Sequence, residues 1–198
     1  MKIKKTQITC ANCKNVFQSR IKLSASSAVF GLDGKPNTTD FFRLIQLCPN
    51  CKYAGYDIEK TQPNGVVSSS LYNPIDPLSV YECAIAVSSD EDKLSLLMEY
   101  TWQLEFAKRN DEATAIRQRL ADYLDVYLEE KPVIELILIY VDVLRQLGRF
   151  EEAVQLVEAV KPKVKLEENI KKDFYKIFIF EECLLHKGDS LPHLRSEV

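Results

Sequence analysis

The chain has 198 residues and a mass of 22.7 kDa, enough for one ordinary domain or for a small metal-stabilised module joined to a larger one. Its 46% hydrophobic and 28% charged residues, with only six glycines, exclude disordered and collagen-like classes. The net charge of −3 is uneven: residues 1–60 carry ten Lys or Arg against four Asp or Glu, whereas residues 61–198 carry sixteen against twenty-five. This asymmetry indicates that the two parts differ in kind.

The N-terminal part predicts short strands around two cysteine pairs. Residues 6–9 lead into the first pair, residues 16–23 roughly alternate in polarity after it, and residues 41–47 (FFRLIQL) lead into the second. Residues 31–40 (GLDGKPNTTD) have the composition of a loop or hairpin tip. Because MKIKKTQITC lacks the apolar run of an export signal, we expect the cysteines to stay reduced.

The two cysteine pairs are the most specific motif in the sequence. They read C-A-N-C, then thirty-four residues, then C-P-N-C. Each pair can form a knuckle that points two thiolates at one ion, and two knuckles supply the tetrahedral shell that zinc favours, with zinc to sulfur distances of about 2.3 Å. The sequence therefore predicts one structural zinc ion, bound by Cys10, Cys13, Cys48 and Cys51; iron accepts the same four ligands.

Other interpretations of these cysteines are less favourable. They can be unrelated core residues, or a redox dithiol, which requires a pair at a helix N-terminus near a βαβ unit rather than beside strands. A catalytic zinc site keeps an open position and generally uses His or carboxylate ligands, but no His precedes His186. Lys14 and Lys52 directly follow the two knuckles, so their charge would offset the −2 charge of a zinc ion with four thiolates.

The C-terminal part predicts an antiparallel stack of helices after the turn-rich segment 61–76 (TQPNGVVSSSLYNPID). Asp76 and Pro77 form a helix start, and Gly148 is a natural helix C-cap. From the apolar periodicity and the capping residues, we expect six helices, at about 76–86, 90–106, 111–127, 133–144, 150–160 and 167–186.

The fourth of these helices is nearly all apolar, yet it is shorter than the roughly 20 residues that span a bilayer. Glu135 and Asp142 also interrupt it. We therefore expect a core helix, no membrane partner and a cytoplasmic location.

No other motif indicates catalysis. The sequence has no G-x-S-x-G, no P-loop and no dinucleotide-binding fingerprint, so we expect a non-enzymatic protein. Cys83 and Cys183 lie in apolar helical segments and are expected to be buried core residues. Adjacent carboxylates such as Glu181 and Glu182 diverge around a helix and are expected to be solvated.

The basic N-terminal part leaves nucleic-acid binding open as an alternative. Cationic side chains contact phosphates, and aromatic side chains stack on bases. The candidate phosphate contacts are Lys4, Lys5, Arg20, Lys22, Arg43 and Lys52, with Phe17, Phe41, Phe42 or Tyr53 available for stacking.

Two resemblances to known families support the prediction of a metal-binding ribbon followed by a stack of helices. LIYVDVLRQLGRFEEAVQLVEAV resembles a tetratricopeptide repeat, with Gly148 ending the first helix and Phe150 and Ala153 at the aromatic and small positions of the second. The double cysteine pair ending in CPNCKYAGY, followed by Trp102 and repeat-like helices, resembles the bacterial family known as domain of unknown function 2225. That resemblance implies a zinc ribbon with tetratricopeptide-like helices and brings no activity.

Together these patterns predict a mainly α protein: a zinc ribbon (residues 1–62), a linker (63–75), a tetratricopeptide-like helical domain (76–190) and a C-terminal tail (191–198). The expected function is a helical-repeat scaffold for a protein or peptide partner. The alternatives are a nucleic-acid-binding ribbon with a helical regulatory domain, and a switch in which oxidation of the thiolates releases zinc.

Overall fold

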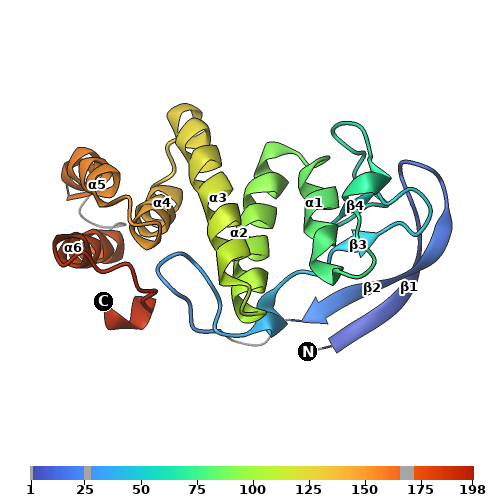
Figure 1. Ribbon diagram of the computed structural model, residues 1–198, viewed down its shortest axis with the longest axis horizontal. Helices are drawn as coiled ribbons and strands as arrows, with labels where there is room; N and C mark the ends of the chain where they lie inside the picture. Colours follow the sequence, from blue (N-terminus) through green and yellow to red (C-terminus); the bar gives the residue numbers. More distant parts are fainter. Residues whose placement is uncertain (1, 25–27, 166–171) are drawn as a thin grey trace. The chain divides into compact units, whose positions relative to one another are not determined.

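A computed structural model of the chain describes residues 2–24, 28–165 and 172–198 (Figure 1). These ranges contain six α-helices and two small antiparallel sheets, which confirms the mainly α class with an N-terminal β segment. The strands are β1 (Lys2–Thr9), β2 (Val16–Ser24), β3 (Gln46–Leu47) and β4 (Ala54–Gly55). The helices are α1 (Val80–Ile85), α2 (Asp90–Phe106), α3 (Asn110–Glu130), α4 (Ile134–Gln146), α5 (Phe150–Lys165) and α6 (Lys172–His186).

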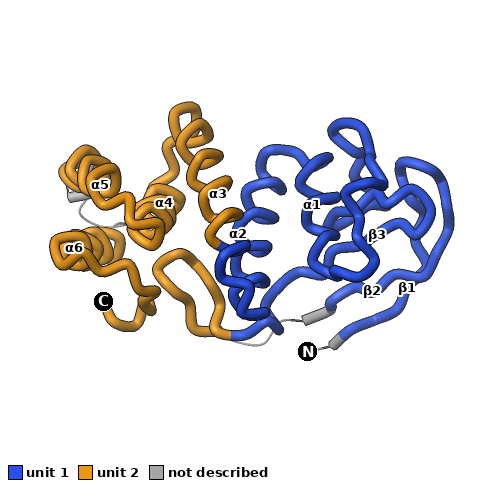
Figure 2. The backbone as a smooth tube through the Cα atoms, in the orientation of Figure 1, with its two compact units in different colours: residues 1–27, 38–113 blue, residues 28–37, 114–198 orange. Residues whose placement is uncertain are grey.

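The chain forms two compact units, whose limits differ from those of the predicted domains (Figure 2). Unit 1 comprises residues 1–27 and 38–113, and unit 2 comprises residues 28–37 and 114–198. The predicted ribbon thus shares a unit with the predicted linker and the first two helices, while its loop belongs with the later helices. Among the described residues, no helix has the length and apolar character that a membrane crossing requires.

In unit 1, β1 and β2 form a regular hairpin. They pair antiparallel from Ile3 opposite Lys22 to Thr9 opposite Val16. The connection between the strands contains Cys10 and Cys13, and the connection between β3 and β4 contains Cys48 and Cys51. Both predicted knuckles therefore lie at hairpin turns.

The predicted strand at residues 41–47 is wrong for most of its length, because only Gln46–Leu47 pairs as a strand. Phe42 instead turns into unit 1, where its ring stacks on Trp102 and meets Phe106 edge to face at centroid distances of 6.1 and 5.8 Å. Lys22 Nζ donates to the carbonyl oxygens of Asp40 and Phe42. The burial of Phe42 and the hydrogen bonds from Lys22 take the place of the inter-strand hydrogen bonds that a strand at these residues would make.

The second helix starts where its sequence predicts, whereas the predicted start of the first at residue 76 is a 3₁₀ turn, and α1 itself begins at Val80. Asp76 caps a short 3₁₀ turn by accepting a hydrogen bond from Leu78 N at 3.1 Å, Pro77 takes the first turn position, and α1 follows. α2 begins after Ser89 with three acidic residues in its first turn, where they complement the helix dipole. The helices pack through Tyr81 and Tyr100, whose rings stack at 5.1 Å.

In unit 2, α4, α5 and α6 pack against one another, and α4 is the buried helix of the three. Every residue from Ile137 to Arg145 is buried, which confirms the prediction of a core helix. Gly148 adopts a φ of 72° after α4, a conformation that glycine adopts without strain, and α5 then begins at Phe150. The predicted sixth helix is observed from Lys172, and its expected start at residue 167 lies outside the described residues.

The predicted C-terminal tail and the loop of residues 28–37 are joined by backbone hydrogen bonds. Leu32 N donates to His193 O at 3.0 Å, and Arg195 N donates to Phe30 O at 3.0 Å. Arg195 Nε also donates to Gly31 O at 3.1 Å. These contacts explain why the loop belongs to unit 2 rather than to the ribbon from which it extends.

Unit 2 also buries an ionic cluster centred on Arg145 of α4. Its guanidinium donates to Glu181 Oε2 at 3.0 Å, to Asp142 Oδ1, and to the carbonyl oxygens of Asp189 and Leu191, each at 2.7 Å. The prediction of Glu181 as a solvated charge is wrong, because its side chain is fully buried beside Arg145. One arginine thus joins α4, α6 and the C-terminal segment.

The stability of unit 2 is expected to decrease with rising pH. Burial, with Asp142 nearby, raises the pKa of Glu181 from 4.5 to about 9. Between these values the folded protein retains a proton that the unfolded chain releases, so this contribution is complete below pH 4.5 and is lost as pH rises toward 9. We expect Glu181→Gln to flatten the fall in unfolding free energy, measured by urea unfolding at several pH values between about 5 and about 9.

The matched control is Glu158→Gln on the exposed face of α5, which should leave the pH dependence unchanged. Equal slopes for native protein and Glu181→Gln would contradict this account of the buried carboxyl group.

Candidate metal centre

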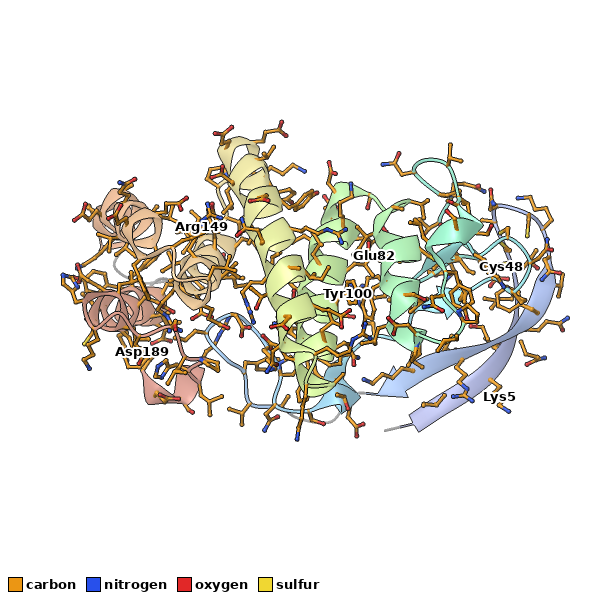
Figure 3. The ribbon with its side chains drawn as sticks, viewed as in Figure 1. Lys5, Cys48, Glu82, Tyr100, Arg149 and Asp189 are labelled. Carbon is orange, nitrogen blue, oxygen red and sulfur yellow. The ribbon has the colours of Figure 1, made fainter. Side chains whose placement is uncertain are left out.

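The four predicted ligands are brought together in unit 1. Cys10 directly follows β1, and Cys48 directly follows β3. Figure 3 labels Cys48 beside the β1–β2 hairpin, where the two knuckles meet. Their four Sγ atoms all lie within 4.8 Å of one another, and all four cysteines are free of disulfides. Among the described residues, this is the one group of three or more potential ligands close enough to hold a metal ion.

The two knuckles have matching backbone hydrogen bonds. Cys10 N donates to Asn15 O, and Cys48 N donates to Tyr53 O, both at 2.9 Å. In the opposite direction, Lys14 N donates to Cys10 O at 2.9 Å and Lys52 N donates to Cys48 O at 3.0 Å. The two C-x-x-C-K segments therefore fold into the same turn, which directs both cysteines of each pair toward one point.

Both knuckles end with a lysine in a left-handed backbone conformation. The φ values are 60° for Lys14 and 64° for Lys52, a region that costs an L-residue roughly 1–2 kcal/mol relative to its preferred conformation. Each side chain folds back on its own knuckle, with Nζ donating to Ala11 O at 2.6 Å or to Pro49 O at 2.7 Å. The lysines thus close the turns, in addition to placing charge near the sulfurs.

The distances between sulfurs fit a tetrahedral ion better than any covalent pairing. Cys10 Sγ lies 3.8 Å from Cys51 Sγ, and Cys13 Sγ lies 3.6 Å from Cys48 Sγ. A disulfide requires about 2.05 Å. Four sulfurs around an ion at about 2.3 Å would be separated by about 3.8 Å along each tetrahedral edge. The geometry therefore fits a four-thiolate shell.

The electrostatics of the site show why a cation suits it. Burial raises the pKa of Cys10 to about 12 and also raises that of Cys48, although backbone N–H groups of each knuckle favour their thiolates. The Asn50 amide, whose Nδ2 lies 3.5 Å from Cys13 Sγ, lowers the pKa of Cys13 to about 6. Ionising all four thiols therefore requires a positive charge among them.

The site belongs to a small hydrophobic core. Cys10 and Cys48 are fully buried, whereas Cys13 and Cys51 are half-buried. The surrounding buried residues come from the ribbon and from the segment that follows α1, and they are Ile8, Ala11, Tyr53, Ile58 and Val87. Without bound metal, this core has few large apolar side chains to hold it together.

Polar side chains that the sequence did not reveal also position the knuckles. Ile58 N donates to the buried Gln46 Oε1 at 3.0 Å, and Thr9 N donates to Glu59 Oε1 at 3.1 Å. Asn50 supports Cys13 directly. Asn precedes the second cysteine in both pairs, and this repetition is the feature of the sequence from which the role of Asn50 could have been predicted.

The predicted nucleic-acid contacts fall into two groups. Lys22 bonds to backbone carbonyls, Lys52 closes its knuckle, and the Arg43 guanidinium lies 3.3 Å from the centroid of the Tyr56 ring and pairs with Glu99 at 3.7 Å. These three are engaged within unit 1. The members of the second group are exposed on the hairpin, and they are Lys4, Lys5 and Arg20.

Most of the aromatic side chains predicted to stack on bases are buried or half-buried. Phe42 and Tyr53 are buried, and Tyr53 Oη donates to Thr61 O at 2.7 Å. Phe17 is half-buried against the cysteine core, whereas Phe41 is exposed. The structure therefore does not gather these rings into one stacking surface.

The two remaining cysteines behave differently from each other. Cys83 is buried in α1 as predicted, and burial raises the pKa of its thiol. The prediction of a buried Cys183 is wrong, because it lies on the exposed face of α6.

Comparisons with models of protein families, with curated proteins and with solved structures each find no match. The resemblance to the family known as domain of unknown function 2225 therefore stays a prediction.

Substitution of Cys48 tests the metal centre. We expect Cys48→Ser to reduce bound metal from about one ion per chain to nearly none, and to lower Tm by roughly 10 °C or more, because three ligands leave the shell open in a small core. Elemental analysis and thermal unfolding measure both quantities. Cys183→Ser, at the exposed cysteine, is the control and should retain the metal. Full metal content in Cys48→Ser would exclude the four-sulfur site.

A second prediction concerns the left-handed lysines. Lys14→Gly removes backbone strain together with one hydrogen bond, so we expect it to retain the metal and to be no less stable than the native protein. Lys14→Val should lower the unfolding free energy by roughly 2 kcal/mol, since a branched Cβ is unfavourable at this φ. Urea unfolding with metal analysis measures both effects. Loss of metal from Lys14→Gly would show that the lysine charge matters more than the turn.

Proposed function

We propose that this is a non-enzymatic interaction protein with one structural zinc ion and a helical surface that binds a protein partner. The observation that carries the proposal is the set of four cysteine sulfurs within 4.8 Å, supplied by two equivalent hairpin turns. The ion bound by Cys10, Cys13, Cys48 and Cys51 would hold the ribbon folded and have no coordination position left for a substrate.

The donor set favours zinc. Four thiolates in a tetrahedral arrangement suit zinc, which has no redox chemistry of its own. The sulfur separations of 3.8 and 3.6 Å fit a four-thiolate shell around either metal. Iron in the same shell is the alternative. A four-thiolate ferric site absorbs visible light and a zinc site does not, so the absorption spectrum of the purified protein distinguishes them.

The helical part supports the second half of the proposal. α4 and α5 pack against each other on either side of the turn at Gly148, and Tyr140, Val141 and Ala153 are buried. This packing supports the proposal of a tetratricopeptide-like pair of helices. Between α5 and α6 lies a cavity of about 490 Å³, lined by Glu158, Lys161, Pro162, Tyr175 and Glu182. Lys161 Nζ pairs with Glu182 Oε2 at 2.5 Å.

This cavity has the character of a binding surface rather than a catalytic site. Its charged side chains include an existing ion pair, and its aromatic and proline rings supply apolar contact area. Such a combination suits a peptide segment with both apolar and charged side chains. We therefore assign the interaction with a protein partner to the α5–α6 surface.

Affinity purification of the tagged full chain from its source organism tests the proposal. Mass spectrometry should identify a specific protein partner, and Tyr175→Ala should reduce its recovery by about tenfold by removing the aromatic anchor. Tyr127→Ala, on α3 of the same unit, is the matched control and should retain the partner. Equal recovery with both variants would contradict the assignment to the α5–α6 surface.

A further inference from the structure

The positive charge of the N-terminal part is concentrated in the β1–β2 hairpin. The first 32 residues contain six Lys or Arg and no Asp or Glu, a net charge of +6. Residues 33–60 contain four of each kind and are neutral. The excess of +6 in the first 60 residues therefore belongs entirely to the segment that forms this hairpin.

Strand register separates the hairpin into two faces. Partners directly opposite in an antiparallel pair lie on the same face, and alternate residues along a strand share it. Ile8 and its partner Phe17 face the cysteine core, together with the buried Ser19. The opposite face, here called the outer face, is exposed and includes Lys5, Gln7, Gln18 and Arg20.

The outer face aligns two like charges. Lys5 and Arg20 are Cα partners, so their Cβ atoms are separated by about 4.5–5.5 Å, an arrangement that destabilises a sheet when charges are equal. Within the described chain, neither side chain has an ion-pair partner, and the outer face from Ile3 to Thr9 and from Val16 to Lys22 has no carboxylate. Figure 3 shows Lys5 toward the N-terminal end of the ribbon, away from Cys48. A polyanion would relieve this repulsion.

We propose that the outer face binds double-stranded DNA, with the two-stranded ribbon in the major groove. This groove is wide enough for a two-stranded β-ribbon. Lys5 and Arg20 would contact phosphates or guanine edges, and the adjacent pair of Gln7 and Gln18 provides amide donors and acceptors for base edges.

The side chains on the outer face favour a duplex over a single strand. Single-strand binding sites combine cations with aromatic rings that stack on bases. The outer face has no aromatic residue, because the one aromatic in these strands, Phe17, faces the cysteine core. The exposed apolar residues Ile3 and Val16 lie at opposite ends of the face, so they do not form the continuous apolar surface that a lipid membrane requires.

Binding of labelled duplex DNA by the metal-loaded full chain tests the proposal. Fluorescence anisotropy with a mixed-sequence duplex of about 20 base pairs is measured between about 50 and about 200 mM salt. Lys5→Gln/Arg20→Gln should weaken binding about tenfold or more at the lowest salt. It should also reduce the slope of log Kobs against log salt by about 2, one for each lost phosphate contact.

The control variant Lys60→Gln/Lys187→Gln makes the same change in net charge at two exposed positions outside the hairpin, and it should bind DNA as the native protein does. Metal content and circular dichroism are recorded on each sample, so that loss of the ribbon fold is distinguished from loss of the DNA contact. Lys5 and Arg20 lie on the solvent-exposed face of the hairpin, where glutamine is compatible with a strand.

Charge reversal at one position separates binding from stability. Lys5→Glu would place a negative charge directly opposite Arg20 in the β1–β2 hairpin. It should therefore preserve or raise Tm while weakening DNA binding more than Lys5→Gln does. If Lys5 had only a structural role, DNA affinity would not fall as Tm rises.

The proposal would be overturned if the protein did not bind the duplex at about 50 mM salt, or if it bound a single strand of the same sequence equally well or more tightly. It would also be overturned if the outer-face and control variants had equal effects, or if Lys5→Glu bound DNA as the native protein does. Binding of phosphatidylserine vesicles or poly-glutamate that depends on Lys5 and Arg20, without duplex binding, would also overturn it in favour of a membrane or an acidic protein.

Discussion

The convergence of four cysteine sulfurs in one small core is the constraint on which the N-terminal structure depends. The sulfurs lie within 4.8 Å of one another, and two of them are fully buried. Four thiolates at this separation repel one another strongly, whereas four neutral thiols bring little apolar area to a core that has few large side chains. A divalent cation resolves both problems, because it binds the thiolates and joins two hairpin turns that otherwise meet through a small hydrophobic contact.

The same turns determine what the ribbon presents to solvent. The first knuckle connects β1 to β2, and therefore fixes the register that begins with Thr9 opposite Val16. Shifting that register by one residue would turn Ile8 outward and Lys5 inward. The convergence of the cysteine sulfurs, burial of the inner face and alignment of Lys5 with Arg20 are thus consequences of one turn geometry. Because unit 2 has its own buried cluster around Arg145, we expect its surface chemistry to be independent of the metal.

The parts that could be predicted from sequence are those determined locally. The spacing within each cysteine pair, the cap at Asp76 and the apolar run of α4 each depend on residues close in the chain, and the structure agrees with them. The meeting of the two pairs is a long-range contact, and it could be predicted because four cysteines in two such pairs are the usual ligands of one metal ion. Residues 41–45 are not a strand because Phe42 meets Trp102, sixty positions away, and Glu181 is buried because Arg145 lies opposite it. The limits of the two units depend equally on long-range contacts, such as those between Leu32 and His193, which no periodicity reveals.

X-ray absorption spectroscopy of the purified full chain tests the central claim most directly, since it reports the identity of the metal, its ligands and their distances in one measurement. We expect an absorption edge of zinc and a first shell of four sulfurs at about 2.3 Å, without nitrogen or oxygen ligands. A shell with fewer sulfurs, a mixed shell with oxygen or nitrogen, or protein without bound metal would contradict it.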